Sequence, residues 1–452
     1  MESPSTMLVT PVGPGTEQGA PATNETPLMI PDAESWTNLY RMEVTSNDSL
    51  TRVRSLLSHR SSTDAVRRFQ GSDAQTFVDF LDRILVQPYL GHKLWQRGLR
   101  LLSKICEAHS IVPASYIRQQ ELICMGTVRY RGGFADVRDG EYLGRHVAIK
   151  SLRNEGDSPK SFKRLCREII CWKHLSHPNI LPLLGVSIST NRRSFKILTE
   201  WMPNGNVKQY TRSNPEANRL KLLSEVMSGV TYIHGLRVVH GDLKGANILV
   251  DNAGTACVAD FGLMTMTDAS AAILSGTAVS PGGTYGWMSP ELLDPSRFGS
   301  DGRPTRESDC YALGMVIYEV LTGLRPFHYL IAPTPVPAVM RGERPIKPIS
   351  ANSLGLTETI WELVELCWSE SSLTRPTAQQ LLDCISSASL TWAPPLVYPA
   401  ARVDFSSIVD PDSNTFDSLT MLTPVSQGVE TITLIGGLLV LVIVLLLFIL
   451  PE

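Results

Sequence analysis

Near its middle the chain carries the stretch His240-Gly241-Asp242-Leu243-Lys244-Gly245-Ala246-Asn247-Ile248-Leu249-Val250. This stretch places a carboxylate, an ammonium group and a side-chain amide close to one another, directly ahead of an apolar segment. Asp260-Phe261-Gly262 follows it, while Val147-Ala148-Ile149-Lys150 and then Glu168, in a helical pattern, precede it. A lone His-x-Asp triplet would be a weak signal, but these elements in this order indicate one catalytic domain.

The elements resemble the motifs of the protein kinase superfamily, whose catalytic loop reads H-R-D-L-x-x-x-N. The resemblance covers about residues 120 to 387 and implies a bilobal α+β fold. Its small lobe is expected over 118–202, as a five-stranded antiparallel sheet with one main helix, and its mostly helical large lobe over 203–387. ATP and Mg²⁺ are the cofactors that the resemblance implies, and proteins are the implied substrates.

The glycine-rich loop of this family is altered in the chain. Gly132 and Gly133 stand where glycines let backbone N–H groups approach the ATP phosphates. Tyr130 and Ala135 replace the usual first and third glycines. Alone this motif would be weak, and its distance from Val147-Ala148-Ile149-Lys150 is what supports it.

The resemblance also assigns the residues that hold the nucleotide. Lys150 is expected to hold the α- and β-phosphates, with Glu168 as its ionic partner on a helix over 161–174. A buried strand from Phe195 leads into the hinge between the lobes. The expected adenine contacts combine a gatekeeper side chain, backbone groups of the hinge and apolar side chains on both sides of the ring: Thr199, Glu200, Met202, Val137, Ala148 and Leu249.

The catalytic loop supplies the expected chemistry. Phosphoryl transfer requires positioning and neutralisation of charge more than covalent chemistry. By resemblance, Asp242 orients the substrate hydroxyl and accepts its proton, and Lys244 neutralises the γ-phosphate. Asn247 and Asp260 would hold the magnesium ions that bridge the phosphates, because amide and carboxylate oxygens suit a hard cation.

Two positions favour serine or threonine over tyrosine as the acceptor. Serine/threonine kinases carry a lysine two residues after the catalytic aspartate, as Lys244 is here. Thr284 resembles the threonine that contacts that aspartate in the same kinases.

Two further features of the large lobe fit the family. Glu291 is expected to form a buried structural bridge with Arg375, and Cys367-Trp368 is typical of the tyrosine-kinase and tyrosine-kinase-like groups.

Gly241 departs from the family pattern, because most regulated kinases have an arginine there that pairs with a phosphate on the activation loop. We hypothesise that activity does not depend on loop phosphorylation in the usual way. Gly241 and the altered glycine loop also leave a second interpretation open, a pseudokinase scaffold that binds nucleotide or protein partners without catalysis. Against it, every charged or amide residue of the expected site is present.

The region before the kinase-like part divides in two. Residues 1–34 are rich in Pro, Thr, Gly and Ser without a hydrophobic period and are expected to be disordered. Residues 35–117 repeat apolar side chains at helical spacing, which predicts two to four amphipathic helices, one of them with a possible cap at Ser72. This region resembles, more loosely, the one that precedes the kinase domain in a large fungal group of tyrosine-kinase-like kinases. Packing on the small lobe is favoured over self-association or partner binding.

The sequence after the kinase-like part predicts a membrane anchor. Ile432 to Leu450 carries no charge, and a helix of about 20 apolar residues spans about 30 Å, the thickness of a bilayer core. A transmembrane helix is therefore expected over 431–450, after a flexible linker over 388–430. A buried core helix is the alternative, although globular helices are rarely apolar on every face.

Only Pro451 and Glu452 follow this segment, so we expect a tail-anchored protein with its kinase part in the cytosol, on endoplasmic reticulum or secretory membranes. A receptor with an external sensor fits poorly, because Met1-Glu2-Ser3-Pro4 lacks the features of a signal peptide. The net charge of -3 gives no hint of a nucleic-acid partner. The eight cysteines are scattered without a C-x-x-C pair, which predicts free thiols in a reducing compartment and no zinc site.

Overall fold

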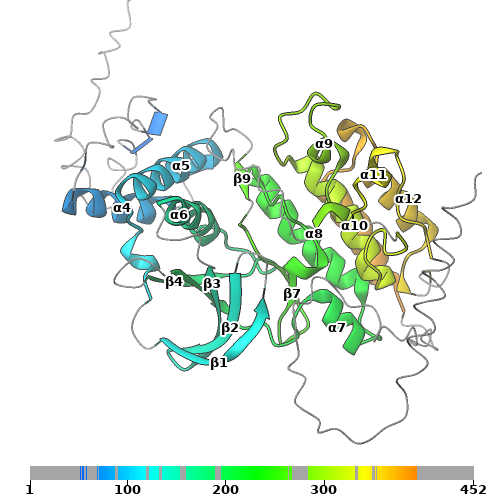
Figure 1. Cartoon of the computed structure of the whole chain (residues 1–452), viewed down its shortest axis with the longest axis horizontal. Coiled ribbons are helices and arrows are strands. Elements are labelled where there is room, and N and C mark those ends of the chain that lie inside the picture. Colours follow the sequence, from blue (N-terminus) through cyan, green and yellow to red (C-terminus); the bar gives the residue numbers. More distant parts are fainter. Residues whose placement is uncertain are drawn as a thin grey trace, which may run out of the picture.

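The computed structural model shows two lobes with a helical block packed on the smaller one (Figure 1). The positions that it describes are 51, 53, 54, 57, 58, 69, 71–86, 90–118, 122–131, 135–152, 159–188, 195–262, 264–266, 284–330, 334–348, 352 and 354–393. The segments 1–34 and 431–450, and nearly all of the predicted linker, lie outside this part of the chain. Within it, no helix is long and apolar enough to cross a membrane.

The small lobe contains the predicted five-stranded antiparallel sheet, with strands in the order β1-β2-β3-β5-β4. A tight turn at Leu143 and Gly144 joins β2 to β3, and both residues have positive φ angles (51° and 72°), as the twist of a two-residue hairpin requires. The strand bounds are β1 Leu122–Arg131, β2 Ala135–Tyr142, β3 Arg145–Leu152, β4 Leu183–Ile188 and β5 Phe195–Glu200.

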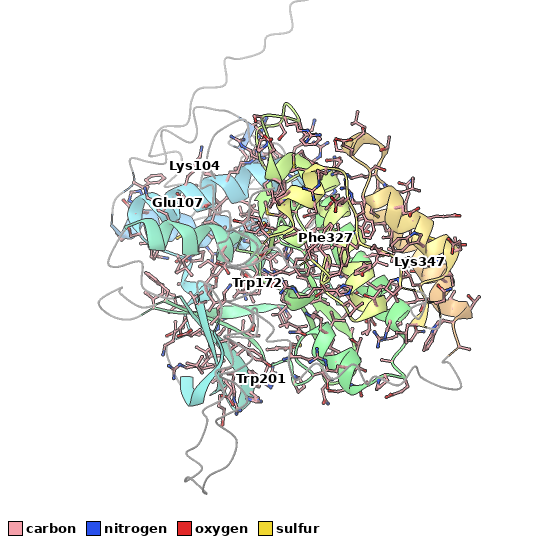
Figure 2. All side chains as sticks on the ribbon, turned by 45° about the vertical axis from the view of Figure 1, so that its right-hand side comes forward. Lys104, Glu107, Trp172, Trp201, Phe327 and Lys347 are labelled. Atoms are coloured by element: carbon pink, nitrogen blue, oxygen red, sulfur yellow. The ribbon has the colours of Figure 1, made fainter. Side chains whose placement is uncertain are left out.

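Helix α6, Pro159–Lys173, covers one face of this sheet (Figure 1). It begins two residues before the predicted 161 and ends one residue before the predicted 174. Its apolar face is buried as expected, at Phe162, Leu165, Ile169 and Trp172. Trp172 lies in the middle of the molecule, whereas Trp201 lies at the edge of the small lobe, just after β5 (Figure 2).

The large lobe is organised around α10, Arg306–Thr322, whose residues from Ser308 to Leu321 are all buried. The helix begins at a capping box, in which the Thr305 hydroxyl accepts from the backbone of Ser308, and it ends at Gly323 in the left-handed conformation (φ 74°). The remaining elements are α7 Val207–Ser213, α8 Arg219–Gly235, β6 Val238–Val239, η3 Gly245–Asn247, β7 Ile248–Val250, β8 Ala256–Val258, β9 Thr265–Met266, η4 Thr284–Gly286, α9 Pro290–Leu293, α11 Val336–Met340, α12 Glu358–Cys367, η6 Ser372–Thr374 and α13 Ala378–Thr391.

The N-terminal block comprises α4, Ser72–Leu85, α5, Gly91–His109, and η2, Ala114–Tyr116. Ser72 is the first helical residue of α4 rather than its cap, because the cap position falls on Gly71 (φ 55°) and no side chain caps the helix. Helix α5 lies alongside α6 (Figure 1), and the apolar faces of the block share one continuous core with both lobes. The block therefore packs on the small lobe.

Candidate active site

The segment from His240 to Asn247 runs between β6 and β7, and buried carboxylates of α10 hold its backbone. Asp309 Oδ2 accepts from the N–H of His240 (2.8 Å), and Asp309 Oδ1 accepts from the N–H of Gly241 (2.9 Å). Gly241 has a φ of 80°, which favours glycine over any residue with a side chain. Glycine at position 241 therefore suits the positive-φ conformation in which the backbone N–H bonds Asp309.

A second carboxylate of α10 supports the same segment further along. Glu319 Oε2 accepts from the N–H of Gly245 (2.8 Å) and from Nε1 of Trp287 (3.1 Å), and Lys208 Nζ lies 3.5 Å from its other oxygen. Burial raises the pKa of Glu319, and these contacts offset only part of that effect. A Cβ at Gly245 would lie 2.7 Å from the carboxylate, so the close approach requires glycine.

The His240 ring braces the loop from inside. Its Nδ1 accepts from the backbone N–H of Asp242 (3.2 Å), and its Nε2 donates to the carbonyl of Ala259 (3.0 Å). These two bonds place the ring proton on Nε2. The imidazole thereby ties the catalytic loop to the residue that precedes Asp260.

The Asp242 carboxylate lies at the centre of the site. Its Oδ2 is 3.0 Å from Lys244 Nζ and accepts from Asn247 Nδ2 at 2.9 Å. Its Oδ1 is buried and has no hydrogen-bond partner among the described residues. Burial raises the pKa of Asp242, and Lys244 opposes part of that increase. The site thus holds a carboxylate of raised pKa whose side chain is 12% exposed, with a cation beside its Oδ2.

Thr284 also reaches this centre, but through a neighbour. Its Oγ1 accepts from Lys244 Nζ at 3.1 Å, while Lys244 bonds Asp242 on its other side. The sequence resemblance suggested a direct contact between the threonine and the aspartate. In the structure Lys244 is instead the link between them.

Lys150 forms one ion pair within the small lobe and a second with the large lobe. Its Nζ is 2.9 Å from Glu168 Oε1 on α6 and 2.8 Å from Asp260 Oδ1 in the large lobe. Burial alone would lower the pKa of Lys150, but the two carboxylates outweigh it and raise the pKa. Glu168 is buried (4 % exposed), whereas the Asp260 side chain stays 44 % exposed. The pairs therefore join α6, β3 and the segment after β8.

The predicted adenine contacts share one face of the small-lobe sheet. Val137 pairs with Lys150, and Ala148 pairs with Thr199. Directly paired residues lie on the same face, as do residues two apart on one strand, so all four side chains face the same side as the Lys150 ammonium group.

The other predicted nucleotide contacts divide between described and undescribed positions. Ala135 and Met202 are buried, Glu200 is exposed, and Leu249 is partly buried on β7 in the large lobe. Gly132 and Gly133 lie outside the described residues.

Asn247 and Asp260 meet the chemical requirements of a magnesium site. The Asn247 amide nitrogen donates to Asp242 O (2.8 Å) and Oδ2 (2.9 Å), which leaves the amide oxygen as its other polar atom. Asp260 adds an exposed carboxylate. No group of three or more His, Cys, Asp or Glu side chains among the described residues could hold a metal by itself, so phosphate oxygens would have to complete the shell. A bound magnesium would supply positive charge toward the phosphates.

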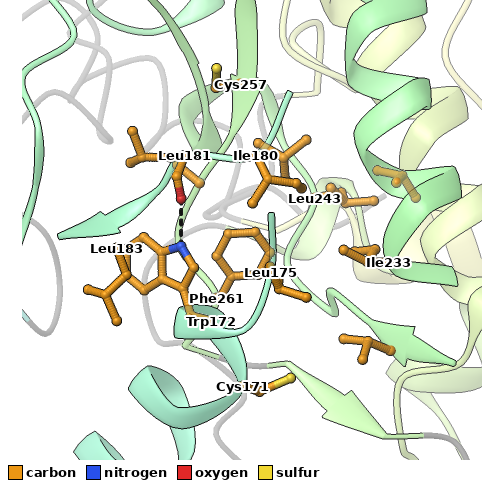
Figure 3. Close-up of a cluster of buried hydrophobic side chains, with 14 of the residues drawn as sticks. Cys171, Trp172, Leu175, Ile180, Leu181, Leu183, Ile233, Leu243, Cys257 and Phe261 are labelled. Carbon is orange, nitrogen blue, oxygen red and sulfur yellow. Dashed lines mark hydrogen bonds between the residues drawn. The ribbon is translucent and has the colours of Figure 1, made fainter. Parts of the chain in front are cut away.

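An apolar stack that sequence reasoning did not assemble links α6 to the catalytic loop. The Phe261 ring lies 5.4 Å from the Trp172 ring and 5.1 Å from the His240 ring, measured between centroids. Trp172 Nε1 donates to the carbonyl of Leu181 at 2.6 Å (Figure 3). The available signal was the position of Trp172 one helical turn after Glu168. Any rotation of α6 would disturb this stack and the ion pair together.

The predicted bridge joins α9, which contains Glu291, to Arg375, the residue directly after η6. Arg375 Nη1 and Nη2 contact the two oxygens of Glu291 at 2.6 and 2.8 Å. The hydrogen bond and charge of the guanidinium outweigh the effect of burial and hold the pKa of Glu291 below its usual value. The guanidinium and the carboxylate form two parallel bonds, and this bidentate geometry fixes their relative orientation as well as pairing their charges.

The order of these groups and their geometry agree with the comparison against protein families. The protein kinase domain pattern matches residues 131–384, more than half of the chain's 452 residues. The chain belongs to the protein kinase domain family. Its α+β fold, with a sheet-rich small lobe and a helical large lobe, confirms the predicted fold class for the described residues.

Several individual relatives are named serine/threonine-protein kinases. The chain is 29% identical over 260 residues to the serine/threonine-protein kinase STY46 of Arabidopsis thaliana, covering 56% of this chain and 42% of that protein. It is 31% identical over 269 residues to the probable serine/threonine-protein kinase drkB of Dictyostelium discoideum, covering 57% and 36%. With the serine/threonine-protein kinase CTR1 of Arabidopsis thaliana it shares 29% identity over 272 residues, covering 58% and 31%. The chain spans less than half the length of each.

Proposed function

We propose that the chain is an active, ATP-dependent serine/threonine protein kinase of the tyrosine-kinase-like group, acting in signalling. The observation that carries the proposal is the Asp242 carboxylate, which has a raised pKa, lies 3.0 Å from Lys244 Nζ and keeps 12% of its side chain exposed. A substrate hydroxyl that donates to this carboxylate would be oriented for attack, and Lys244 would neutralise charge on the transferred phosphoryl group.

In the proposed reaction the substrate oxygen forms a bond to the γ-phosphorus while the bond from that phosphorus to the β,γ-bridging oxygen breaks. Asp242 takes the hydroxyl proton, and ADP leaves with the bonding electrons. Lys150 holds the α- and β-phosphates, and Glu168 keeps its ammonium group in place. Asn247 and Asp260 would hold magnesium, which adds positive charge at the phosphates.

The acceptor class is the first part of this proposal to test. The purified full-length chain is incubated with labelled ATP, magnesium and three peptide pools that differ only in a central Ser, Thr or Tyr. We expect label on the Ser and Thr pools and none with Asp242→Asn. Label confined to the Tyr pool would overturn the assignment, and ATP binding without transfer would favour the pseudokinase scaffold.

We also propose that activity is independent of activation-loop phosphorylation. The backbone N–H of Gly241 is held by Asp309, and position 241 offers no guanidinium to a loop phosphate. Replacing Ser275, Thr277 and Ser280 together by Ala is expected to leave kcat/KM within two-fold of the parent. A loss of activity with unchanged thermal stability would contradict this proposal.

Finally, we propose that residues 431–450 anchor the kinase in a membrane as a tail anchor, with the kinase domain facing the cytosol. The proposal is supported by a charge-free apolar segment of about the length that a bilayer core requires. The full chain is expected to float with liposomes and to resist carbonate extraction, whereas a chain without 431–450 is expected to do neither and to keep its activity on soluble peptides. Equal flotation of both chains would overturn it.

A further inference from the structure

A buried polar cluster joins the N-terminal block to the end of α6. Asp82 of α4 accepts from the hydroxyls of Tyr116 (2.7 Å) and Ser115 (2.8 Å). His174, the residue directly after α6, places its Nε2 3.1 Å from Asp82 Oδ1 and 3.2 Å from the Tyr116 hydroxyl. Buried polar groups that are fully paired specify one arrangement of the elements that carry them. This cluster therefore fixes where α6 ends relative to α4.

The block contacts α6 from outside. Figure 1 shows α6 between the sheet on one side and α5 on the other. Glu168 extends from α6 toward the sheet, where it meets Lys150. On the opposite side, the apolar face of α5 includes Leu99, Leu102 and Ile105, all fully buried in the shared core. Helix α6 is thus held on both sides within this chain.

The same block also touches the large lobe. Gln96 of α5 is buried, and its Nε2 donates to the carbonyl of Leu236 at 2.8 Å, with the carbonyl of Arg237 at 3.4 Å. These carbonyls lie directly after the end of α8 at Gly235, and β6 and the catalytic loop follow. One helix therefore bridges the two lobes on the side away from the hinge.

We propose that the α4–α5 block is a positioning element for phosphoryl transfer: Asp82 holds α6, and with it Glu168, in the place that Lys150 requires, while Gln96 sets the spacing of the lobes. The proposal rests on the proposed catalytic activity. It accounts for how α6 keeps its place in this chain, in which residue 241 is glycine and no arginine there can bind a phosphate on the activation loop. Asp82, His174 and Gln96 are positioning residues and touch no reacting atom.

The chain offers a matched pair of variants for Asp82. Asp79 lies on the same helix, and it accepts hydrogen bonds from groups within the block, the N–H of Ala114 (2.7 Å) and the amide of Gln75 (3.2 and 3.3 Å). We expect Asp82→Ala to lower kcat about ten-fold or more, with the KM for peptide little changed, because the donors it leaves are buried and unpaired. Asp79→Ala is expected to stay within about two-fold of the parent, since it breaks no bond to α6.

A second pair covers the case in which Asp82→Ala fails to fold. Gln96→Ala removes the bond from α5 to the large lobe, and Gln75→Ala removes an equivalent amide-to-carbonyl bond inside the block, to Val112 (3.0 Å). Gln96→Ala is expected to lower kcat about five-fold, as for one lost hydrogen bond, and Gln75→Ala is not. Equal effects of the two variants on kcat would overturn the proposed role of Gln96.

Hydrogen exchange measures how firmly α6 is held, independently of catalysis. Amides of α6 are expected to exchange faster in Asp82→Ala than in Asp79→Ala, while amides of α10 exchange alike in both. A parent chain that transfers no phosphate would contradict the catalytic proposal. The exchange rates of the α6 amides would then be the remaining test of whether the block positions α6. Equal exchange of α6 in the two variants, or faster exchange throughout, would overturn that role.

Discussion

Replacing Arg375 by alanine is expected to destabilise the large lobe strongly. The Arg375 side chain is fully buried (0 % exposed), and its two bonds to Glu291 measure 2.6 and 2.8 Å. It also donates to the backbone carbonyls of Ser369 (3.0 Å) and Glu307 (3.2 Å) and lies 5.2 Å from the Tyr311 ring centroid. Truncation would leave a partly buried carboxylate (12% exposed) and several carbonyls without their donor.

The size of the effect follows from this burial. Removing one partner of a buried ion pair costs about 3–5 kcal/mol, and in a domain of this size each kcal/mol lowers the Tm by about 2–4 °C. We therefore expect the Tm to fall by about 10 °C at pH 7. Arg375→Lys keeps one charge but not the bidentate fork, and an intermediate loss is expected.

The pH dependence has a defined sign. The folded pKa of Glu291 is lowered, so the contribution of the pair is present above the ordinary carboxyl value of 4.5 and is lost as the pH falls through the lower folded value. The gap in Tm between the parent and Arg375→Ala should therefore be wide at pH 7 and narrow below about pH 4.5.

The matched control is an exposed pair of the same residue types. Arg341 Nε lies 2.7 Å from Glu343 Oε1, with side chains 63% and 44% exposed. Such pairs contribute about 0–1 kcal/mol, so Arg341→Ala should change the Tm little. Thermal unfolding followed by circular dichroism measures all variants. A Tm loss for Arg375→Ala no larger than that for Arg341→Ala would refute the reasoning.

Three further predictions concern the site. Glu168→Gln should lower kcat about 10²-fold at nearly unchanged Tm, because the ammonium group of Lys150 keeps only one of its two carboxylates; a steady-state assay beside a melting curve measures both. Lys244→Met should move the acid limb of kcat/KM to higher pH, since ionised Asp242 loses its nearest cation; an unmoved limb would contradict this. Trp172→Phe should lower the free energy of unfolding in urea by about 1–3 kcal/mol, because a buried carbonyl loses its donor.

The fold and the central residues could be predicted because the family's motifs are local in sequence. Asp242, Lys244 and Asn247 stand within one short loop, and Val147-Ala148-Ile149-Lys150 marks a strand by itself. Glu168 could be placed on α6 from its helical pattern. The resemblance then supplied which of these side chains meet across the cleft.

The supporting contacts could not be predicted in this way. Asp309 and Glu319 lie on a helix that is buried along its whole length from Ser308 to Leu321, so helical spacing marks no particular face for them. Gln96 meets the end of α8 across 140 positions of sequence, and Asp82 meets His174 although α5, η2, three strands and α6 lie between them in sequence. Hydrophobic periodicity identifies a helix, but it does not identify which distant backbone carbonyl a buried amide will reach. The cap at Ser72 was wrong by one residue for a local reason, because Gly71 can adopt the positive φ there.

The most direct test of the central claim measures binding and transfer on one preparation of Asp242→Asn. If Asp242 accepts the substrate proton while Lys150 and the hinge hold the nucleotide, the variant should bind ATP with magnesium as the parent chain does. Its transfer of phosphate to Ser or Thr peptides should fall to background. Transfer at the parent rate by Asp242→Asn would contradict the account, because the carboxylate at the centre of the site would then have no part in the chemistry.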